Sequence, residues 1–434
     1  MALPIDKINA RMEGEFKFHG RTYSVPFTTP GDLVQFKLGR RAGRLHMEVL
    51  HIERANPPNE PLVTPFCPVF GDCGGCKGQH LPYARQIELK SAPAFLGMQE
   101  LGITPEIIQA PAFQNYRDRM DFSVEGLTLG LRGLREYGRF VDIETCAIQQ
   151  EPANAILKIV RATLAGFPGL GFERATGAGI LKYATIRTGL THCLVLTVDE
   201  GKTSDERYLA FTKILEATLP VDCSLVESTT KYPSDISCPP GGRAIRGIPG
   251  LKARLGGIEF DVAYDAFFQP YPEAFDRLLD WARGFGAGQG NALVDLYCGT
   301  GVLSSIWTSF FPGQFKHVRG YEFTESAVTS ARKNFLRFNG STEFYAADLT
   351  QIQIDFKPDD FVIADPPRAG LSAGIRKSLL VNPVKNLLYV SCNTETQIRD
   401  LNELNTAYDI AGACVVDCYP QTPHLEAAVF LRAR

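Results

Sequence analysis

The chain has 434 residues, 44% hydrophobic and 21% charged, which is longer than a single hydrophobic core usually grows, so two or three domains are expected. No run of about 18 apolar residues is present, and the start MALPIDKINARMEGE carries charges where a signal peptide needs an apolar stretch. We therefore expect a cytoplasmic protein with no membrane partner. The net charge of -3 neither favours nor excludes a nucleic-acid partner.

Residues 1–55 form a first predicted unit, a small β-module. Short alternating runs such as EFKF and TYSV are separated by the turn pairs His19-Gly20 and Pro30-Gly31, which is typical of a compact barrel. Nine Lys and Arg residues stand against six Asp and Glu residues in this stretch. Such a basic excess is compatible with contacts to a phosphate backbone and equally with a solvated face.

A proline-rich segment at 56–61 reads NPPNEP and predicts a linker, since its three prolines exclude a helix or a central strand. A middle region follows over 62–250, with a basic stretch LRGLREYGRF and strand and helix patterns whose topology the sequence does not give. From about residue 290, strands, glycine turns and helices alternate, which predicts a doubly wound α/β domain.

Four of the eleven cysteines are expected to act together. Cys67, Cys73 and Cys76 lie within ten residues in CPVFGDCGGC, and Cys146 in ETCAIQ lies in the same region. Eleven cysteines are too sparse for a disulfide framework in a chain this long, so metal binding, catalysis or burial is indicated. Four thiolates suit either zinc or an iron-sulfur cluster, and three clustered ligands plus one distant ligand favour the cluster.

The segment ALVDLYCGTG at 292–301 predicts a ligand pocket, because a buried strand ends there in a glycine turn followed by a helix. Gly299 and Gly301 permit a tight turn against a ligand, and Glu322 stands about twenty residues on, where a carboxylate can bind ribose hydroxyls. The third glycine of the dinucleotide spacing is missing, so an adenosine ligand without pyrophosphate is favoured over nicotinamide. S-adenosylmethionine meets that description.

Two further strand ends are candidates for chemistry. Asp365 begins the rigid turn DPPR after DFVIA, at the edge where the pocket is expected. An aromatic residue in place of Arg368 would favour amino-group methylation, whereas arginine leaves carbon methylation, which needs a thiol nucleophile. Cys392 ends the strand in LLYVSCNTE, and burial as a small hydrophobe and service as a nucleophile are the two alternatives for it.

Taken together, these motifs resemble the RNA 5-methyluridine methyltransferases of the iron-sulfur-containing branch, including enzymes of 23S rRNA. The resemblance rests on CPVFGDCGGCKGQH with Cys146, then FFQ, DLYCGTG, DPPRAGL, YVSCNTE and PQTPHLE. It implies a TRAM-like, OB-type module at 1–55, a central α+β domain at 62–250 carrying a [4Fe-4S] cluster, and a Rossmann-like S-adenosylmethionine-dependent methyltransferase domain at 251–434. The implied cluster ligands are Cys67, Cys73, Cys76 and Cys146.

The resemblance also implies the active-site residues. S-adenosylmethionine would be bound by Gln269, Tyr297, Glu322, Asp348 and Asp365, with Cys392 as nucleophile and Glu426 as general base. The chain departs from the family pattern at Pro270 and Val302, around the cofactor pocket.

The expected activity is methyl transfer to carbon 5 of a uridine in RNA, through a thiolate that adds at carbon 6 and a carboxylate that removes the carbon 5 proton. We expect a monomer acting on ribosomal RNA in preference to tRNA. A tRNA enzyme and a non-catalytic iron-sulfur RNA-binding protein are the alternatives.

Overall fold

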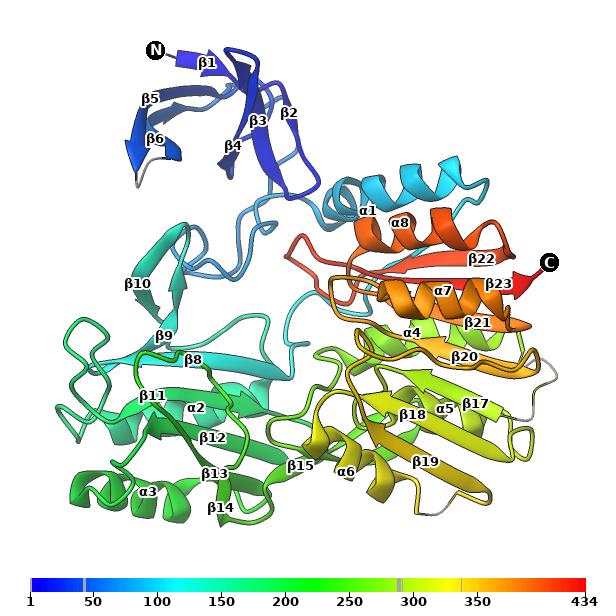
Figure 1. Cartoon of the computed structure of the whole chain (residues 1–434). Coiled ribbons are helices and arrows are strands. Elements are labelled where there is room, and N and C mark those ends of the chain that lie inside the picture. The colour runs from blue at the N-terminus through cyan, green and yellow to red at the C-terminus, as the bar shows by residue number, and fades with distance from the viewer. Residues whose placement is uncertain (1, 42–43, 287–289, 291, 337) are drawn as a thin grey trace.

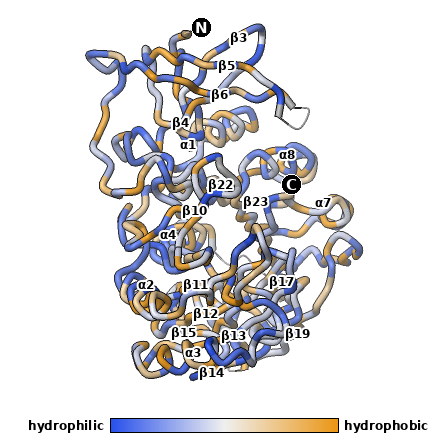
Figure 2. The backbone as a smooth tube through the Cα atoms, turned by 90° about the vertical axis from the view of Figure 1, so that its left-hand side faces the viewer, coloured by the Kyte–Doolittle hydropathy of each residue, from blue (hydrophilic) through white to orange (hydrophobic). Residues whose placement is uncertain are grey.

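The computed structural model describes residues 2–41, 44–286, 290, 292–336 and 338–434, and their strands form three regions (Figure 1). None of the described helices combines the length and the apolar composition needed to cross a membrane. The N-terminal module lies at one end of the molecule, above α1 and α8, in both Figure 1 and Figure 2.

Two three-stranded antiparallel sheets build the N-terminal module. One contains β1 (Ala2–Pro4), β5 (Leu33–Arg41) and β6 (Arg44–Glu53); the other contains β2 (Lys7–Ile8), β3 (Glu13–Phe18) and β4 (Arg21–Pro26). His19 and Gly20 both have positive φ and close the β3–β4 hairpin, as their sequence predicts. The small core between the sheets contains Ile5, Phe16, Val25, Val34 and Phe36.

A seven-stranded sheet forms the central region. Its order is β10-β9-β8-β11-β12-β13-β14, and α2 (Glu151–Leu164) and α3 (Glu206–Thr218) pack against its apolar side chains. The strands are β8 (Arg119–Glu125), β9 (Thr128–Gly133), β10 (Glu136–Asp142), β11 (Leu181–Arg187), β12 (His192–Asp199), β13 (Cys223–Thr230) and β14 (Arg243–Arg246). The basic stretch LRGLREYGRF is the β9–β10 hairpin.

The C-terminal region contains an eight-stranded sheet of order β19-β18-β17-β20-β21-β23-β22-β7. The five strands from β19 to β21 are parallel, and β23 is antiparallel to both of its neighbours. The strands are β17 (Ala292–Leu296), β18 (His317–Glu322), β19 (Ser341–Ala346), β20 (Asp360–Ala364), β21 (Asn386–Ser391), β22 (Tyr408–Val416) and β23 (Glu426–Ala433). The predicted doubly wound fold is confirmed.

Helices cover both faces of this sheet, which explains why its central strands read as continuous apolar runs. On one face lie α4 (Pro272–Arg283), α5 (Val302–Phe310) and α6 (Glu325–Asn334); on the other lie α1 (Tyr83–Glu100), α7 (Ala373–Val381) and α8 (Thr394–Leu404). The ribbon of β15 (Gly250–Leu255) and β16 (Ile258–Ala263) connects this region to the central sheet.

One part of the expected central region, 62–250, packs elsewhere. Helix α1 lies against α8, and β7 (Glu106–Ile108) pairs in parallel with β22 at the edge of the C-terminal sheet (Figure 1). The cause is the apolar face of α1, where Ala94 and Met98 are fully buried in the same core as Leu401. The chain therefore completes the C-terminal sheet with a segment that precedes the central sheet.

Candidate active site and cysteine cavity

Four of the sequence-predicted residues lie at one edge of the C-terminal sheet. Tyr297, Asp365 and Cys392 directly follow β17, β20 and β21, and Glu322 is the last residue of β18. These strands are parallel and adjacent, and the strand order reverses between β17 and β20. Ligands of open α/β sheets bind at such a reversal, outside the carboxyl ends of the strands.

The glycine turn after β17 is fixed by the carboxylate of Glu322. Gly299 donates its backbone N–H to Glu322 Oε2 at 3.2 Å, and Oε1 accepts from the Thr324 N–H at 2.9 Å. Gly301 has φ +75°, and a Cβ there would come within 3.2 Å of the Ala331 side chain. The turn thus requires glycine and holds Glu322 beside the start of α5.

Several buried side-chain oxygens of the C-terminal region have no hydrogen-bond partner among the described residues, and Asp295 and Gln269 each carry one of them. Asp295 is fully buried and accepts from the Ser304 N–H at 3.1 Å through Oδ2, while its Oδ1 bonds to none of the described residues. Gln269 is 7% exposed, and its Oε1 likewise has no partner in the part of the chain that the structure describes. Buried polar atoms are nearly always paired, so these two are candidates for contacts with a bound ligand.

Burial raises the pKa of Asp295 to about 7, with Asp365 and Glu322 adding to the effect. Burial likewise raises the pKa of Asp365 to about 7. Sequence reasoning left Asp295 out of the predicted site, although a single acid inside the apolar run ALVDL was a usable signal.

The two remaining predicted cofactor residues, Tyr297 and Asp348, already use polar atoms in hydrogen bonds within the protein. The Tyr297 hydroxyl accepts a hydrogen bond from the Ser372 N–H at 3.2 Å. The backbone of Tyr297 has a positive φ of +60°. Asp348 uses Oδ1 to bind the N–H and hydroxyl of Thr350, at 2.9 and 2.7 Å, and these bonds lower its pKa. One carboxylate oxygen of Asp348 is therefore already engaged in its own turn.

Strand register places Cys392 opposite Glu426. Ser391 of β21 pairs with Ala427 of β23, so the next residue of one strand faces the preceding residue of the other. Cys392 is half-buried, and Glu426 is 2% exposed. The structure thus brings together two residues that the sequence separates widely.

The electrostatic surroundings of this pair are acidic, with one nearby cation. Burial raises the pKa of Cys392 to about 11, and Glu426 and Asp365 add to the rise, whereas Arg368 opposes it. Burial and Asp365 also raise the pKa of Glu426 well above its usual value, and a hydrogen bond from Tyr419 opposes that. Asn393 caps α8 by accepting from the Glu395 N–H, so Cys392 directly precedes the N-terminal end of a helix.

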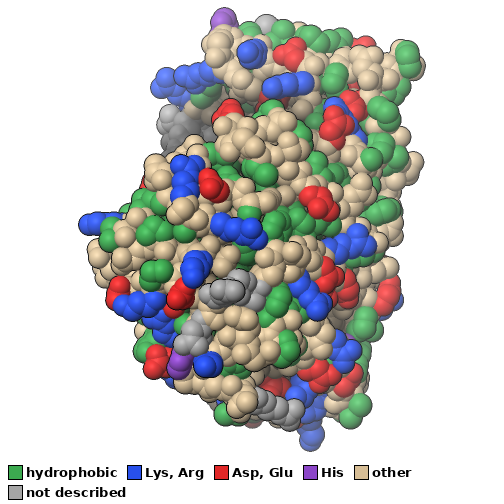
Figure 3. All heavy atoms as spheres, turned by 90° about the vertical axis from the view of Figure 1, so that its right-hand side faces the viewer, with side chains coloured by type: hydrophobic (Ala, Val, Ile, Leu, Met, Phe, Trp, Pro, Cys, Tyr) green, Lys and Arg blue, Asp and Glu red, His purple; other side chains and the backbone are tan. Residues whose placement is uncertain are grey.

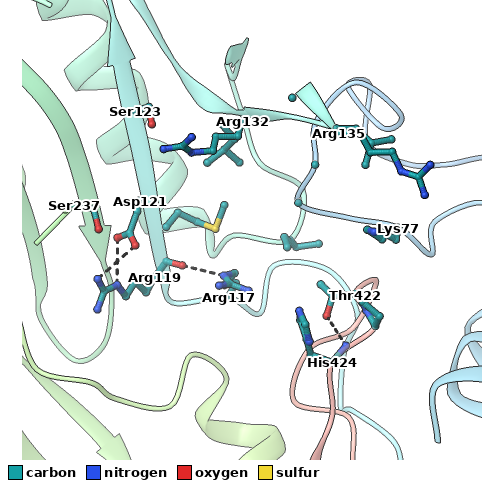
Figure 4. Close-up of a pocket in the computed structure, with 18 of the residues that line it drawn as sticks. Lys77, Arg117, Arg119, Asp121, Ser123, Arg132, Arg135, Ser237, Thr422 and His424 are labelled. Atoms are coloured by element: carbon teal, nitrogen blue, oxygen red, sulfur yellow. Dashed lines mark hydrogen bonds and ion pairs between the residues drawn. The ribbon is translucent and has the colours of Figure 1, made fainter. Parts of the chain in front are cut away.

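A cleft of about 990 Å³ opens beside this pair, and Lys and Arg outnumber Asp and Glu among the residues that line it (Figure 4). The Lys and Arg residues come from the N-terminal module, the cysteine segment, the central sheet and the turn after β20: Arg11, Lys77, Arg117, Arg119, Arg132, Arg135 and Arg368. Thr422 and His424 of the β22–β23 loop also line it, as Figure 4 shows. By contrast, the face in Figure 3 mixes acidic and basic side chains.

The four predicted cluster ligands line one small, mainly apolar cavity of about 30 Å³: Cys67, Cys73, Cys76 and Cys146. Burial raises the pKa of Cys73 to about 11 and that of Cys76 to about 12, and the neighbouring thiols add to both rises. Gly75 donates its N–H to Cys73 Sγ at 3.4 Å. Within the described ranges, no three His, Cys, Asp or Glu side chains are close enough together to hold one metal ion.

Family models match two overlapping parts of the chain. Residues 336–434 match tRNA (Uracil-5-)-methyltransferase, and residues 282–382 match the methyltransferase small domain. Both matches fall on the C-terminal sheet and its active-site edge.

Curated relatives match the whole length. An uncharacterized RNA methyltransferase of Leptospira interrogans is 30% identical over 99% of this chain and 96% of its own. Another from Listeria innocua is 30% identical over 100% of this chain and 97% of its own.

Among solved structures, the tRNA (uracil-54, C5)-methyltransferase of Pyrococcus abyssi, in complex with S-adenosyl-L-homocysteine, superposes with a TM-score of 0.77. It is 25% identical, and the match covers 99% of this chain and 100% of that one. The similarity therefore extends beyond the methyltransferase fold to all three regions.

Proposed function

Because this chain belongs to the RNA (uracil-5-)-methyltransferase family and is an S-adenosylmethionine-dependent enzyme, we propose that it methylates carbon 5 of a specific uridine through a covalent bond to Cys392. The observation that carries this proposal is the strand register that sets Cys392 opposite Glu426, beside Asp365. A thiol and a carboxylate at one strand edge are the two groups that the reaction requires.

The residues of the strand edge suit S-adenosylmethionine, which supplies the methyl group. Glu322 is held where a carboxylate can accept hydrogen bonds from ribose hydroxyls. The oxygens of Asp295 and Gln269 that have no partner among the described residues offer acceptors to this ligand. Tyr297, Asp348 and Asp365 complete the proposed set, in which Asp295 is an addition to the residues expected from the sequence.

The proposed reaction has two stages. The Cys392 thiolate adds to carbon 6 of the uracil, and carbon 5 becomes enolate-like and takes the methyl group, whose bond to the sulfonium sulfur breaks so that S-adenosylhomocysteine leaves. Glu426 then accepts the proton from carbon 5, the carbon 6–sulfur bond breaks, and the thiolate leaves. Arg368 and the N-terminal end of α8 favour the thiolate against the surrounding carboxylates.

RNA is proposed to bind along the basic cleft, with the target uridine looped out toward Cys392. The N-terminal module, as a TRAM-like, OB-type unit, would add phosphate contacts. Of the basic residues in this module, the side chains of Arg41 and Arg44 lie outside the part of the chain that the structure describes. We propose large-subunit ribosomal RNA as the first candidate substrate; the likeness to the Pyrococcus abyssi tRNA enzyme favours tRNA as the second.

We further propose that the cysteine cavity holds a [4Fe-4S] cluster. Four thiols that line one mainly apolar cavity are the donor type that iron-sulfur clusters and zinc use, and the N–H of Gly75 donates to one of the sulfurs. In the present geometry the four thiols are not yet close enough together to bind one ion, so the cluster would draw them together. Gly74, Gly75 and Lys77 of the same segment line the basic cleft. A bound cluster would therefore fix the conformation of a segment that lines the proposed RNA-binding cleft. The methyl-transfer steps above need no electron from the cluster.

The decisive experiment traps the covalent intermediate. Cys392→Ala should abolish both methylation and adduct, whereas Glu426→Gln should transfer the methyl group and then fail to release the RNA. Denaturing electrophoresis with labelled S-adenosylmethionine and RNA from a strain lacking the enzyme should show a stable band for Glu426→Gln alone. Wild-type turnover by Cys392→Ala would overturn the mechanism. Mass spectrometry of ribosomal and transfer RNA from the same strain identifies the missing 5-methyluridine.

A further inference from the structure

The loop Asp417–Leu425 connects β22 to β23 and ends next to the proposed base. Val416 pairs with Glu426 where the two strands meet, so the loop leaves and re-enters the sheet at that residue pair. Its conformation therefore decides what surrounds the Glu426 carboxylate.

Helix α1 holds this loop from behind. Lys90 is fully buried and donates from Nζ to Asp417 Oδ1 at 2.5 Å and to the carbonyl oxygens of Tyr419, Thr422 and His424 at 3.2 to 3.3 Å. Tyr83 of the same helix donates its hydroxyl to Asp417 Oδ2 at 2.9 Å. A buried charge bonded in this way allows the loop very few alternative conformations.

Within this loop, Tyr419 is hydrogen-bonded directly to the Glu426 carboxylate. Its hydroxyl donates to Glu426 Oε1 at 2.9 Å. The other oxygen, Oε2, is buried and has no hydrogen-bond partner among the described residues. The two oxygens of one carboxylate are thus made unequal, because one is occupied and the other is available.

We propose that Tyr419 is a positioning residue for the carbon 5 proton transfer: it anchors Glu426 Oε1 so that Oε2 faces the methylated uracil. The inference rests on the proposed role of Glu426 as general base. Anchoring one oxygen fixes the side-chain torsion, which an unanchored carboxylate would have to restrict during the reaction. Tyr419 touches neither reacting atom in this scheme and acts through Glu426.

The Tyr419 hydroxyl also affects the pKa of the proposed base, Glu426. The groups facing Glu426 are Asp365 after β20, Cys392 after β21, and Tyr419 and Cys418 in the loop, with the Lys90–Asp417 pair behind them. Among these groups, the Tyr419 hydrogen bond lowers the pKa of Glu426, while burial and Asp365 raise it. Burial and Glu426 raise the pKa of Tyr419 itself, so its hydroxyl stays protonated and remains a donor.

The test is Tyr419→Phe, which removes one oxygen and keeps the ring. Methyl transfer in a single turnover should be unchanged, but release of the product should slow by about tenfold, the scale of a lost hydrogen bond to a charged group. Methylated RNA should then accumulate on Cys392 at neutral pH. Because the pKa of Glu426 rises when its donor is lost, the acidic limb of the kcat profile should move to higher pH, and alkaline buffer should restore much of the rate.

Tyr408→Phe is the matched control. Tyr408 starts β22, and its hydroxyl accepts from the Val384 N–H at 2.9 Å, so this variant also loses a buried hydroxyl of the same sheet. It should leave adduct level and pH profile unchanged, even if its Tm falls. S-adenosylmethionine binding by calorimetry, equal in both variants, verifies that each is folded.

Three outcomes separate the two proposals. If Glu426→Gln traps the adduct while Tyr419→Phe shows the wild-type profile and no accumulation, the role of Tyr419 is overturned and the base assignment stands. If Glu426→Gln fails to trap an adduct that Cys392 still forms, the base assignment fails and Tyr419 falls with it. If Tyr419→Phe adds nothing to Glu426→Gln in the double variant, the tyrosine acts through the carboxylate, as proposed.

Discussion

The cysteine cavity and the active-site edge both bring groups that become negative on ionisation close together: thiols in the cavity, and carboxyls with one thiol at the edge. The two regions differ in their access to solvent and in the charges around them. In the cavity, burial raises the thiol pKa values of Cys73 and Cys76, and neighbouring thiols add to both rises. At the edge, Asp365 and Glu426 lie close to Cys392, and the buried Asp295 lies close to Asp365. In both places, a bound cation would relieve the cost of ionising these groups.

The difference lies in access and in the nearby cation. The cavity is small and mainly apolar, whereas the edge borders a large basic cleft, where Arg368 stabilises the thiolate of Cys392. A closed set of thiols suits a cation that is bound permanently, and an open edge suits a cation that comes and goes, such as a methyl sulfonium. The same residue type, cysteine, is thus assigned to two kinds of chemistry by its surroundings.

The prediction with the largest expected effect concerns metal content, which should depend on the cysteines of the cavity and not on Cys392 at the edge. Cys146→Ser should reduce iron from about four atoms per anaerobically purified chain to near zero, because a cubane loses one of its four ligands. Cys193→Ser, at a buried cysteine outside the cavity, should keep its iron, as should Cys392→Ala. Elemental analysis and the visible absorption spectrum provide the measurement. One zinc and no iron in the wild-type protein would replace the cluster by a zinc site.

A second prediction concerns the reactivity of Cys392. Since Arg368 lowers the pKa of this thiol, Arg368→Gln should raise it and slow alkylation by iodoacetamide about tenfold at pH 8, equivalent to roughly one pKa unit. In the wild-type protein the alkylation rate should climb with pH toward about 11. Mass spectrometry of the Cys392 peptide measures the rate, and Arg332→Gln on the outer side of α6 is the control. Equal rates in both variants would exclude Arg368 as the stabilising charge.

A third prediction concerns stability. The pKa of Asp295 is raised to about 7 in the folded state, so the folded chain retains a proton that the unfolded chain has lost between about pH 4 and 7. Stability from this group is therefore complete below pH 4 and falls as the pH rises through 7. Asp295→Asn should stabilise the fold by about 2 kcal/mol at pH 8 and by almost nothing at pH 4, while weakening S-adenosylmethionine binding.

Denaturant unfolding at the two pH values tests this expectation. Asp355→Asn is the control, since the side chain of Asp355 is 71% exposed and should change stability little at either pH. Destabilisation of Asp295→Asn at pH 8 would mean that the Ser304 hydrogen bond outweighs the buried charge.

The smallest expected effect concerns the cleft that borders the edge. Arg117→Gln should weaken RNA binding a few-fold and reduce the salt slope of the binding constant by about one, as the loss of one phosphate contact does. Lys158→Gln on the exposed side of α2 should change neither quantity. Filter binding at several salt concentrations measures both. An unchanged slope for Arg117→Gln would place the RNA path elsewhere.

The sequence alone allowed the strand edge to be predicted, because DLYCGTG, DPPR and YVSCN each join a strand to its turn within a few residues. It could not predict the bonds of Lys90 to the β22–β23 loop or of Tyr419 to Glu426, which depend on packing between distant segments. Nor could it predict β7, whose three residues are too few for a periodic pattern. The cysteine spacing predicted a shared site, and the shared cavity agrees with it, whereas the bound group remains a prediction.

Helix α1 is synthesised long before the segments that bury its apolar face. Lys90 leaves the ribosome 327 residues before its partner Asp417, which corresponds to about 15 to 65 s at ordinary elongation rates. During that interval the nascent chain carries a helix whose buried face, including Ala94 and Met98, has no strand to cover. The edge of the C-terminal sheet is closed only when translation is nearly complete, so a chain stopped before β22 exposes both surfaces to chaperones and proteases at once.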